Sequence, residues 1–394
     1  MRYPQHTVAS GWSFTKLAGG LQGVRTVIFD PLGNMLVSQA RKGISVHTFG
    51  PDGCIASSSM LISSIALNHG LSLTPDGSTL YASSETNVWS WPYDPATQKV
   101  GQQKTVITGM ATGIHSTRNV MVVPQQPNLV LVQVGSNSNL DMQSEQPATG
   151  RAIVKVFDMS AVPANGYNYN TGGEVFAYGL RNEIGFTADP NGKVWGVENS
   201  GDDITRDGVN IHIDNPAEKL NFLGDPVADR DQFFGYPTCF SIWDPAPFRG
   251  LTTGDHFALN SAGDASCNEQ AIKPRLSFQA HSAPIANTFD ANATNMYVTF
   301  HGSWDRQPPT GFKVVEIPFT QLESGKFDPV AAATSREGYK DIFSAANPGS
   351  CTANGLTMSN CFRLTAAAWD PAGRGLVVGS DNSAEGELYL LSRV

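Results

Sequence analysis

Six short segments of the chain share one turn chemistry, and this repeat constrains the fold more than any other feature. In each segment an apolar strand runs into a turn that contains Asp, Pro, Asn or Gly, and a second apolar strand follows. An apolar run, a turn of this kind and an alternating run predict a β-hairpin. The segments are FDPLGNMLVSQ at Phe29, LTPDGSTLYAS at Leu73, VPQQPNLVLVQVG at Val123, ADPNGKVWGVENSG at Ala188, FDANATNMYVTFHGS at Phe289 and WDPAGRGLVVGSD at Trp369.

Strand-turn-strand units that recur about every 40 to 50 residues are typical of a β-propeller, because each blade buries its faces only against its neighbours. The first spacings agree with this period, and the wider intervals before the fifth and sixth units leave room for long inter-blade loops, such as residues 215–250. We therefore predict an all-β fold, a six-bladed β-propeller that occupies residues 1–394 as one domain. Several small β domains in tandem are the alternative, but no charged or Ser/Pro-rich linker separates the units.

The composition limits the partners of this chain. The formal net charge is -9 and the sequence has no Lys/Arg run, which argues against a nucleic-acid or anionic-membrane partner. No apolar run approaches the roughly 20 residues that a membrane-spanning helix needs. The first residues, MRYPQHTVASGW, lack the apolar core of a signal peptide, so a secreted form would already have lost its signal.

Cysteine usage indicates a secreted, extracellular protein. Cys351 and Cys361 have the spacing of a small closed loop, Cys239 and Cys267 could bracket a second one, and Cys54 is left unpaired. The absence of any C-x-x-C motif from the sequence makes a zinc ribbon or a thioredoxin-like redox site a poor interpretation.

Polar residues just before or after the predicted hairpins are candidates for a site, because the loops between blades converge on one face. Taken singly, a histidine there is more often a hydrogen-bonded structural residue, and an arginine usually braces a loop. Their recurrence at the ends of five blades directs several positive charges at one axis, which is costly without an anion. The sequence thus predicts a polyanionic ligand. The candidate residues are Asn68, His69, His115, Arg181, Asn182, His301, Trp304, Arg306 and Arg363.

An oxygen-rich segment, ENSGDD at residues 198–203, follows the fourth hairpin. Its carboxylates and the backbone carbonyls of Ser200 and Gly201 are donors of the kind that calcium prefers. The spacing is not that of an EF-hand, and an ordinary Asx-rich turn explains the segment about as well.

Three motifs together resemble a known family. GIHSTRNVMV, GLRNEIGFTADPNGKVWGVENSGDD and HGSWDRQPPTGFKV are similar to the soluble quinoprotein sugar dehydrogenases of the six-bladed glucose and L-sorbosone dehydrogenase family, above all to the quinoprotein domain of fungal pyranose dehydrogenases. The resemblance covers nearly the whole chain. It implies pyrroloquinoline quinone (PQQ) and calcium at the propeller axis, and oxidation of a sugar by hydride transfer to the quinone. An external acceptor such as a cytochrome would take the electrons; the chain has no C-x-x-C-H haem motif, so that acceptor would lie on another domain or chain.

The resemblance also implies roles for single residues. His115 matches the catalytic base, and Arg181 matches the arginine that contacts the quinone oxygens. The carbonyls of Ser200 and Gly201 match the calcium ligands. The remaining matches are the cofactor contacts Asn68, His69, Asn182, Arg306 and Arg363 and the wall residues His301 and Trp304.

Two departures from the family pattern leave alternatives open. Ser136 stands where bacterial members carry an aspartate that orients the base, and Cys361 stands where they carry a second arginine. A calcium-dependent six-bladed lactonase or esterase is the main alternative; it would ligate metal through side chains and has no need of the arginines. A non-catalytic propeller that binds carbohydrate or protein is the other.

Overall fold

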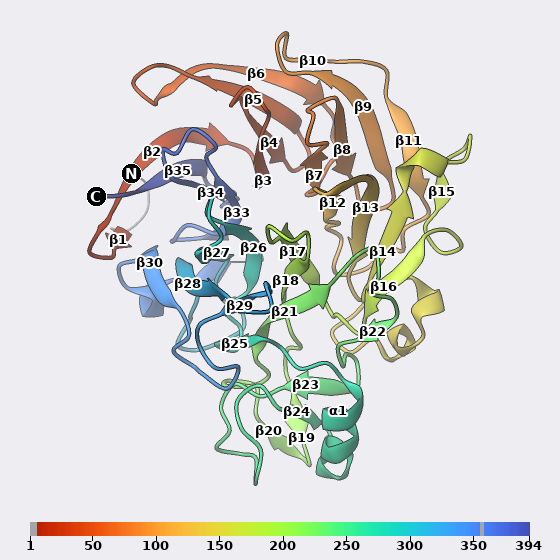
Figure 1. Cartoon of the computed structure of the whole chain (residues 1–394). Coiled ribbons are helices and arrows are strands. Elements are labelled where there is room, and N and C mark those ends of the chain that lie inside the picture. The colour runs from red at the N-terminus through yellow and green to blue at the C-terminus, as the bar shows by residue number, and fades with distance from the viewer. Residues whose placement is uncertain (1–5, 355–357) are drawn as a thin grey trace.

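Six β-sheets surround a central axis in the computed structural model, which describes residues 6–354 and 358–394 (Figure 1). The prediction of an all-β, six-bladed propeller is confirmed. Residues 1–5, the start of the stretch considered above as a signal, lie outside the described residues. Within the described part of the chain, none of the helices has the length and apolar character needed to cross a membrane.

The first three blades follow one another along the chain, each with its innermost strand first in sequence. Blade 1 contains β3 (Val24–Phe29), β4 (Met35–Gln39), β5 (Gly43–Phe49) and β6 (Ile55–Ser63). Blade 2 contains β7 (Leu71–Leu73), β8 (Thr79–Ser83), β9 (Val88–Asp94) and β11 (Lys104–Thr108), with β10 (Lys99–Val100) and β15 (Tyr167–Asn168) at its edge. Blade 3 contains β12 (Val120–Val123), β13 (Gln126–Val134), β14 (Ile153–Asp158), β16 (Glu174–Tyr178) and the short β22 (Gln232–Phe233).

The last three blades include both ends of the chain. Blade 4 contains β17 (Glu183–Ala188), β18 (Val194–Glu198), β21 (Glu218–Gly224) and β25 (Leu276–Phe278). Blade 5 contains β26 (Pro284–Phe289), β27 (Asn295–Phe300), β28 (Lys313–Gln321), β30 (Lys340–Ala345) and β1 (His6–Val8), with β29 (Phe327–Pro329) paired to β28. Blade 6 contains β33 (Leu364–Trp369), β34 (Leu376–Ser380), β35 (Gly386–Arg393) and β2 (Trp12–Leu21).

Each of the six predicted hairpins joins the innermost strand of a blade to its second strand. In the first hairpin, Asp30 Oδ1 accepts hydrogen bonds from the backbone amides of Leu32 and Asn34, both at 2.9 Å. Gly33 then closes the turn at φ 81°, a conformation that glycine adopts without a steric penalty. In blade 5, Ala293 takes the corresponding place at φ 52°. Local turn chemistry therefore explains why the repeat was visible in the sequence.

Neighbouring blades cover both faces of the second strands. All five residues of β4, β18 and β34 are buried, which accounts for their nearly continuous apolar and small side chains. The six innermost strands line a central cavity of about 520 Å³. The ends of these strands therefore surround one axis, and the loops at either end are brought close together.

The ring is closed by strands from opposite ends of the chain. β2 pairs antiparallel with β35, from Trp12 opposite Arg393 to Leu21 opposite Gly386. β1 adds a further strand to the outer edge of blade 5. Backbone hydrogen bonds thus hold the N-terminal strand β2 in blade 6, and the chain continues from β2 into blade 1.

The prediction that residues 215–250 form one long inter-blade loop was wrong in part. They include β21, the third strand of blade 4. Its polar Glu218, Lys219 and Asn221 interrupt the alternation of apolar and polar residues expected of a strand. They are buried, because they form an internal polar network instead of facing the solvent. The segments before and after β21, within residues 199–275, form an insertion seen as a lobe at the bottom of Figure 1. It contains β19 (Thr205–Arg206), β20 (Val209–Asn210), β23 (Cys239–Ser241), β24 (His256–Ala258) and α1 (Asp264–Gln270).

Both suspected cysteine pairs are disulfides, and this gives a test of stability. Replacing Cys351 and Cys361 by serine releases a loop of sequence separation 10, which in the chain-entropy model lowers the free energy of unfolding by about 3 kcal/mol. Urea unfolding measures the change. The control is Cys54→Ser, at an exposed free cysteine, which should stay within about 0.5 kcal/mol of the parent. Equal stability of the double variant and the control would show that the loop constraint contributes nothing.

Candidate functional site

The predicted site residues lie at the ends of the strands that meet on one face of the propeller. Backbone and side-chain contacts join adjacent blades there. Asn68 Nδ2 donates to the carbonyl of Ser116 at 2.7 Å, which links the loops before blades 2 and 3. The amide of Ser136 donates to the carbonyl of Arg181 at 2.8 Å, which links blades 3 and 4. The expected convergence of these loops is therefore present in the structure.

Asp381, after β34, lies at the centre of one group of side chains. Its carboxylate accepts a hydrogen bond from His301 Nε2 at 2.7 Å and pairs with Arg25 Nη1 at 2.5 Å. Arg25 Nε in turn donates to His69 Nδ1 at 3.1 Å. Burial, assisted by the charge of Arg363, lowers the pKa of His301 to about 4. Burial and Arg25 likewise hold the pKa of His69 well below its usual value, so both imidazoles are neutral at pH 7.

Arg363 adds a second guanidinium to the same group. Arg363 is only 1% exposed and lies close enough to Asp381 and Arg25 to interact electrostatically with both. Burial lowers the pKa of Arg363 to about 10, which still leaves it charged at pH 7. The group thus combines two guanidinium groups with one carboxylate, and Arg363 Nη1 also donates to the carbonyl of Gly302 at 2.9 Å. Guanidinium groups are suited to binding carboxylates, so this part of the face fits an anionic ligand.

His115 lies in the loop before β12 with a defined tautomer. Its Nδ1 lies 2.9 Å from the carbonyl oxygen of Ser136, which can only accept, so Nδ1 carries the proton and Nε2 has the free lone pair. The Ser136 hydroxyl is 3.0 Å from the same nitrogen and donates to the Ser138 carbonyl at 2.7 Å. Burial, and then the charge of Arg181, lower the pKa of His115 to about 3. The backbone of Ser136 thus supplies the orienting acceptor that its side chain lacks.

A buried arginine that the sequence analysis did not single out holds the His115 loop. Arg118 is 1% exposed, and its guanidinium donates to the backbone carbonyls of Glu85 at 3.0 Å and Thr117 at 2.9 Å. It also donates to the carbonyls of Ala111 and His115. Four carbonyl contacts from one planar group fix the path of this loop across two blades.

Arg181 and Asn182 precede β17. Arg181 Nη2 pairs with Asp202 Oδ2 at 2.8 Å and donates to Asn139 Oδ1 at 2.9 Å. Asn182 Oδ1 accepts from Gln133 Nε2 at 3.1 Å. Both side chains are buried, and their positions are set by the loops of blades 3 and 4.

The oxygen-rich segment presents its backbone rather than its side chains. Glu198 pairs with Lys219 inside blade 4 at 2.6 Å, and Asn199 Nδ2 donates to the carbonyl of Pro284 at 2.6 Å. Among the hydrogen bonds of residues 6–354 and 358–394, none ends on the carbonyl oxygen of Ser200 or Gly201. These two carbonyls therefore fit a hard cation better than the flanking side chains do.

Trp304 and Arg306 follow β27 and differ from the residues above. Trp304 is 54% exposed and presents an open aromatic face. Arg306 donates to the carbonyls of Ile213 at 2.5 Å and Pro308 at 3.1 Å and pairs with Asp214 at 3.1 Å. In the described part of the chain its contacts thus hold the insertion, and none of them joins it to the Arg363 group.

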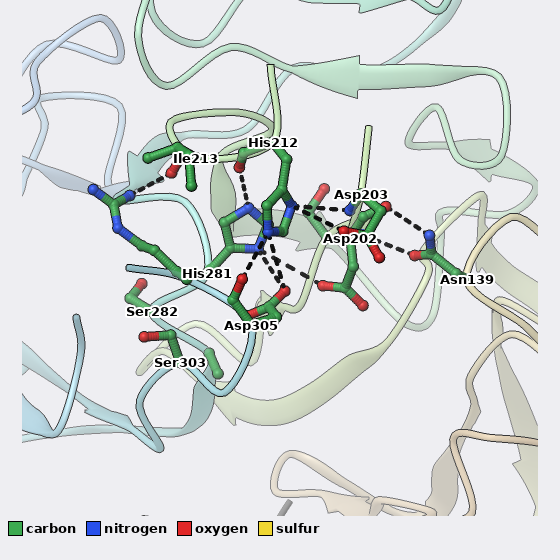
Figure 2. A network of polar contacts seen from close by, with 12 residues as sticks. Asn139, Asp202, Asp203, His212, Ile213, His281, Ser282, Ser303 and Asp305 are labelled. Carbon is green, nitrogen blue, oxygen red and sulfur yellow. Dashed lines mark hydrogen bonds and ion pairs between the residues drawn. The ribbon is translucent and has the colours of Figure 1, made fainter. Parts of the chain in front are cut away.

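A second polar cluster lies beside Arg181 and was also missed from the sequence. His212, His281 and Asp305 place possible ligand atoms within 4.8 Å of one another, and Figure 2 shows Asp202 directed at the same point. Burial would lower the pKa of His281, but contacts with Asp202 and Asp305 raise it to about 10. Nothing in the periodicity of the sequence marks these residues, because they come from three separate loops.

Comparison with known proteins identifies the family. Residues 6–394 match the model of the TrAA12-like family, so the chain belongs to it. A pyrroloquinoline quinone-dependent pyranose dehydrogenase of Coprinopsis cinerea is 39% identical over 402 residues, which are 99% of this chain and 55% of the relative. The chain thus spans about half the length of this curated relative.

Solved structures agree with this assignment. The holo form of the pyranose dehydrogenase PQQ domain from Coprinopsis cinerea has a TM-score of 0.95 at 40% identity, covering 99% of this chain and 97% of that one. A calcium structure of Carbohydrate-Active Enzymes family AA12 from Trichoderma reesei has a TM-score of 0.89 at 35% identity, covering 100% and 98%. The fold and the family are therefore the same.

The pKa shifts of two histidines predict opposite charge states. His115, with its pKa lowered to about 3, should be neutral at pH 5, whereas His281, with its pKa raised to about 10, should be an imidazolium at pH 8. An ordinary histidine, with a pKa near 6.5, behaves in the opposite way at both values. Nitrogen NMR of the ¹⁵N-labelled, cofactor-free protein measures this, with assignment by His115→Gln and His281→Asn. Titration of either ring between pH 5 and 8 would contradict the geometry described above.

Proposed function

We propose that this chain is the PQQ-binding domain of an oxidoreductase that oxidises a sugar. The observation that carries the proposal is a neutral His115, with its lone pair on Nε2, on the same face as the guanidinium groups of Arg25 and Arg363. The name of the Coprinopsis cinerea relative supports both the cofactor and the substrate class.

The donor set of the face fits PQQ and calcium. Arg25 and Arg363 would hold carboxylates of the cofactor, and Arg181 would lie at the quinone oxygens. The carbonyls of Ser200 and Gly201 would hold calcium, in keeping with the Trichoderma reesei relative solved with calcium. When bound, the cofactor supplies an ortho-quinone that accepts a hydride.

His115 is the residue suited to take the proton of the sugar hydroxyl. Its Nε2 accepts that proton while Nδ1 stays bound to the Ser136 carbonyl, so the ring keeps its orientation as it becomes charged. The carbonyl contacts of Arg118 hold the His115 loop in place. Trp304, 54% exposed in the loop after β27, would stack on the sugar or on the planar cofactor.

We also propose an external electron acceptor, a haem (cytochrome) domain or protein, and secretion of the protein. The disulfides Cys239–Cys267 and Cys351–Cys361 support an oxidising compartment.

The geometry argues against the calcium-dependent lactonase. Such an enzyme needs carboxylate or amide side chains on its metal, whereas Glu198 and Asn199 are directed into blade contacts and Asp202 is paired with Arg181. A non-catalytic propeller has no need of a neutral, oriented base.

One reconstitution tests the proposal and its metal requirement. The protein, treated with chelator, receives one equivalent of PQQ with or without calcium, and a dye acceptor reports turnover with a panel of sugars. We expect bleaching of the dye only with calcium, and far weaker PQQ binding in chelator, because the Ser200 and Gly201 carbonyls have no cation to hold. Equal PQQ affinity in both conditions would remove calcium from the site, and hydrolysis of a lactone without dye reduction would favour the lactonase.

Removal of the base should slow the chemistry without loss of the fold. His115→Gln should still bind PQQ and calcium, while reduction of bound cofactor by sugar slows by about 100-fold to 10,000-fold, the usual cost of losing a positioned base. Stopped-flow absorbance measures the rate. The control is His47→Gln, at a buried histidine hydrogen-bonded to Ser45 and Ser58 within blade 1, which should lose stability but keep its rate. A normal rate in folded His115→Gln would exclude His115 as the base.

A further inference from the structure

His281 lies between carboxylates from two different blades. It precedes β26, whereas Asp202 follows β18 and Asp305 follows β27. Its Nδ1 is 3.3 Å from Asp305 Oδ2 and 3.7 Å from Asp202 Oδ1 (Figure 2). Its Nε2 donates to the backbone carbonyl of His212 at 2.5 Å. One imidazole therefore contacts three loops at the edge of the candidate site.

The backbone at His281 is held in an unusual conformation. His281 has φ 63° and Ala283 has φ 56°, in the left-handed region that residues other than glycine rarely adopt. Strain of this kind persists only where the surroundings fix the chain, and it is concentrated at functional sites. The side chain of His281 is 3% exposed, so its contacts and not the solvent determine its position.

The surroundings of the ring require a cation. The side chain of Asp305 is 7% exposed, and its Oδ2 makes no hydrogen bond within the described residues; it lies 3.3 Å from His281 Nδ1 and 3.9 Å from His212 Nε2. A buried carboxylate in this position is costly unless a positive charge faces it. A doubly protonated His281 supplies that charge, in agreement with the raised pKa of its ring given above.

Asp202 connects this ring to Arg181. Its Oδ1 faces His281, and its Oδ2 pairs with Arg181 Nη2 at 2.8 Å. Asn139 fixes the backbone of Asp202 through contacts of 2.8 Å to its amide and 2.6 Å to its carbonyl (Figure 2). The two cations thus bind opposite oxygens of one carboxylate, so a change at His281 alters the partner of Arg181.

We propose that His281 is a positioning residue: bridged between Asp202 and Asp305, it fixes Asp202 and through it the guanidinium of Arg181 at the candidate site. The consequence for catalysis rests on the proposed function, in which Arg181 contacts the cofactor. The bridge itself does not depend on that function and can be measured in the cofactor-free protein.

A metal ion is the competing occupant of this cluster. His212 is not available as its ligand, because Nδ1 accepts from the amide of Asp203 at 2.9 Å and Nε2 donates to the carbonyl of Asp305 at 2.9 Å. That leaves one histidine nitrogen and two carboxylates, one of them already paired with Arg181. The contacts therefore favour a proton on His281 over a metal.

The test uses His281→Asn, because asparagine tolerates the left-handed backbone and keeps a neutral donor without the charge. The matched control is His47→Asn, at a buried and doubly hydrogen-bonded histidine far from the insertion in sequence. In cofactor-free protein, we expect the NMR signal of the Arg181 Nε–H, assigned through Arg181→Lys, to shift in His281→Asn and to stay unchanged in His47→Asn. An unchanged signal in folded His281→Asn overturns the proposal.

With cofactor, the prediction is a loss of PQQ affinity of about 10-fold or more in His281→Asn, a cost typical of lost supporting contacts. In an Arg181→Met background the same substitution should have little further effect, because its influence passes through Arg181. Additive losses would show that His281 acts independently of Arg181 and would overturn the proposal. Failure of the parent protein to bind PQQ would instead refute the proposed function, leaving the NMR result to decide on the bridge.

A last measurement addresses the metal. Zinc and manganese are added to parent and His281→Asn protein, and bound metal is counted after gel filtration. We expect no stoichiometric retention in either. If the parent retained one equivalent of metal and His281→Asn did not, the cluster would hold a metal instead of a protonated His281, and the proposed bridge would be overturned.

Discussion

Closure of the ring is the constraint on which the rest of the structure depends. A blade buries its two faces only against its neighbours, so an open row of six blades would leave two apolar faces in water. Pairing of β2 with β35 removes that exposure by building blade 6 from both ends of the chain. Only in the closed ring do side chains as distant in sequence as Arg25 and Asp381 form an ion pair, with Nη1 and Oδ2 2.5 Å apart.

The charges on the resulting face are balanced more closely than the sequence indicated. Arg25, Arg181 and Arg306 each pair with an aspartate from another loop, so the expected row of uncompensated cations does not exist in the described structure. Arg363 places a second guanidinium close to Arg25 and Asp381. This local pair of guanidinium groups, rather than a row of cations around the axis, is the feature suited to carboxylates of a ligand.

The properties of His115 come from its surroundings rather than from its own side chain. A carbonyl oxygen selects the tautomer, burial beside Arg181 keeps the ring neutral, and the carbonyl contacts of Arg118 hold the loop. The missing aspartate at position 136 is therefore compensated by a backbone atom. Replacement of the aspartate by Ser136 removes a carboxylate, but the hydrogen bond that orients the ring of His115 is still present.

Local rules were sufficient for the repeated part of the fold. The Asp, Pro and Gly residues of the hairpin turns and the apolar second strands lie in short stretches, and they predicted the six blades and the face on which the candidate residues meet. The spacing of the cysteines indicated the two disulfides. β21 was missed, because its buried Glu218 and Lys219 are stabilised by groups from β18 and the loop after it. Arg118, Asp305 and Asp381 lie within motifs that were recognised, but like His281 they were not identified, because their partners lie in other loops. Their protonation states and partners depend on distances between loops of different blades, and those distances are decided only when the ring closes.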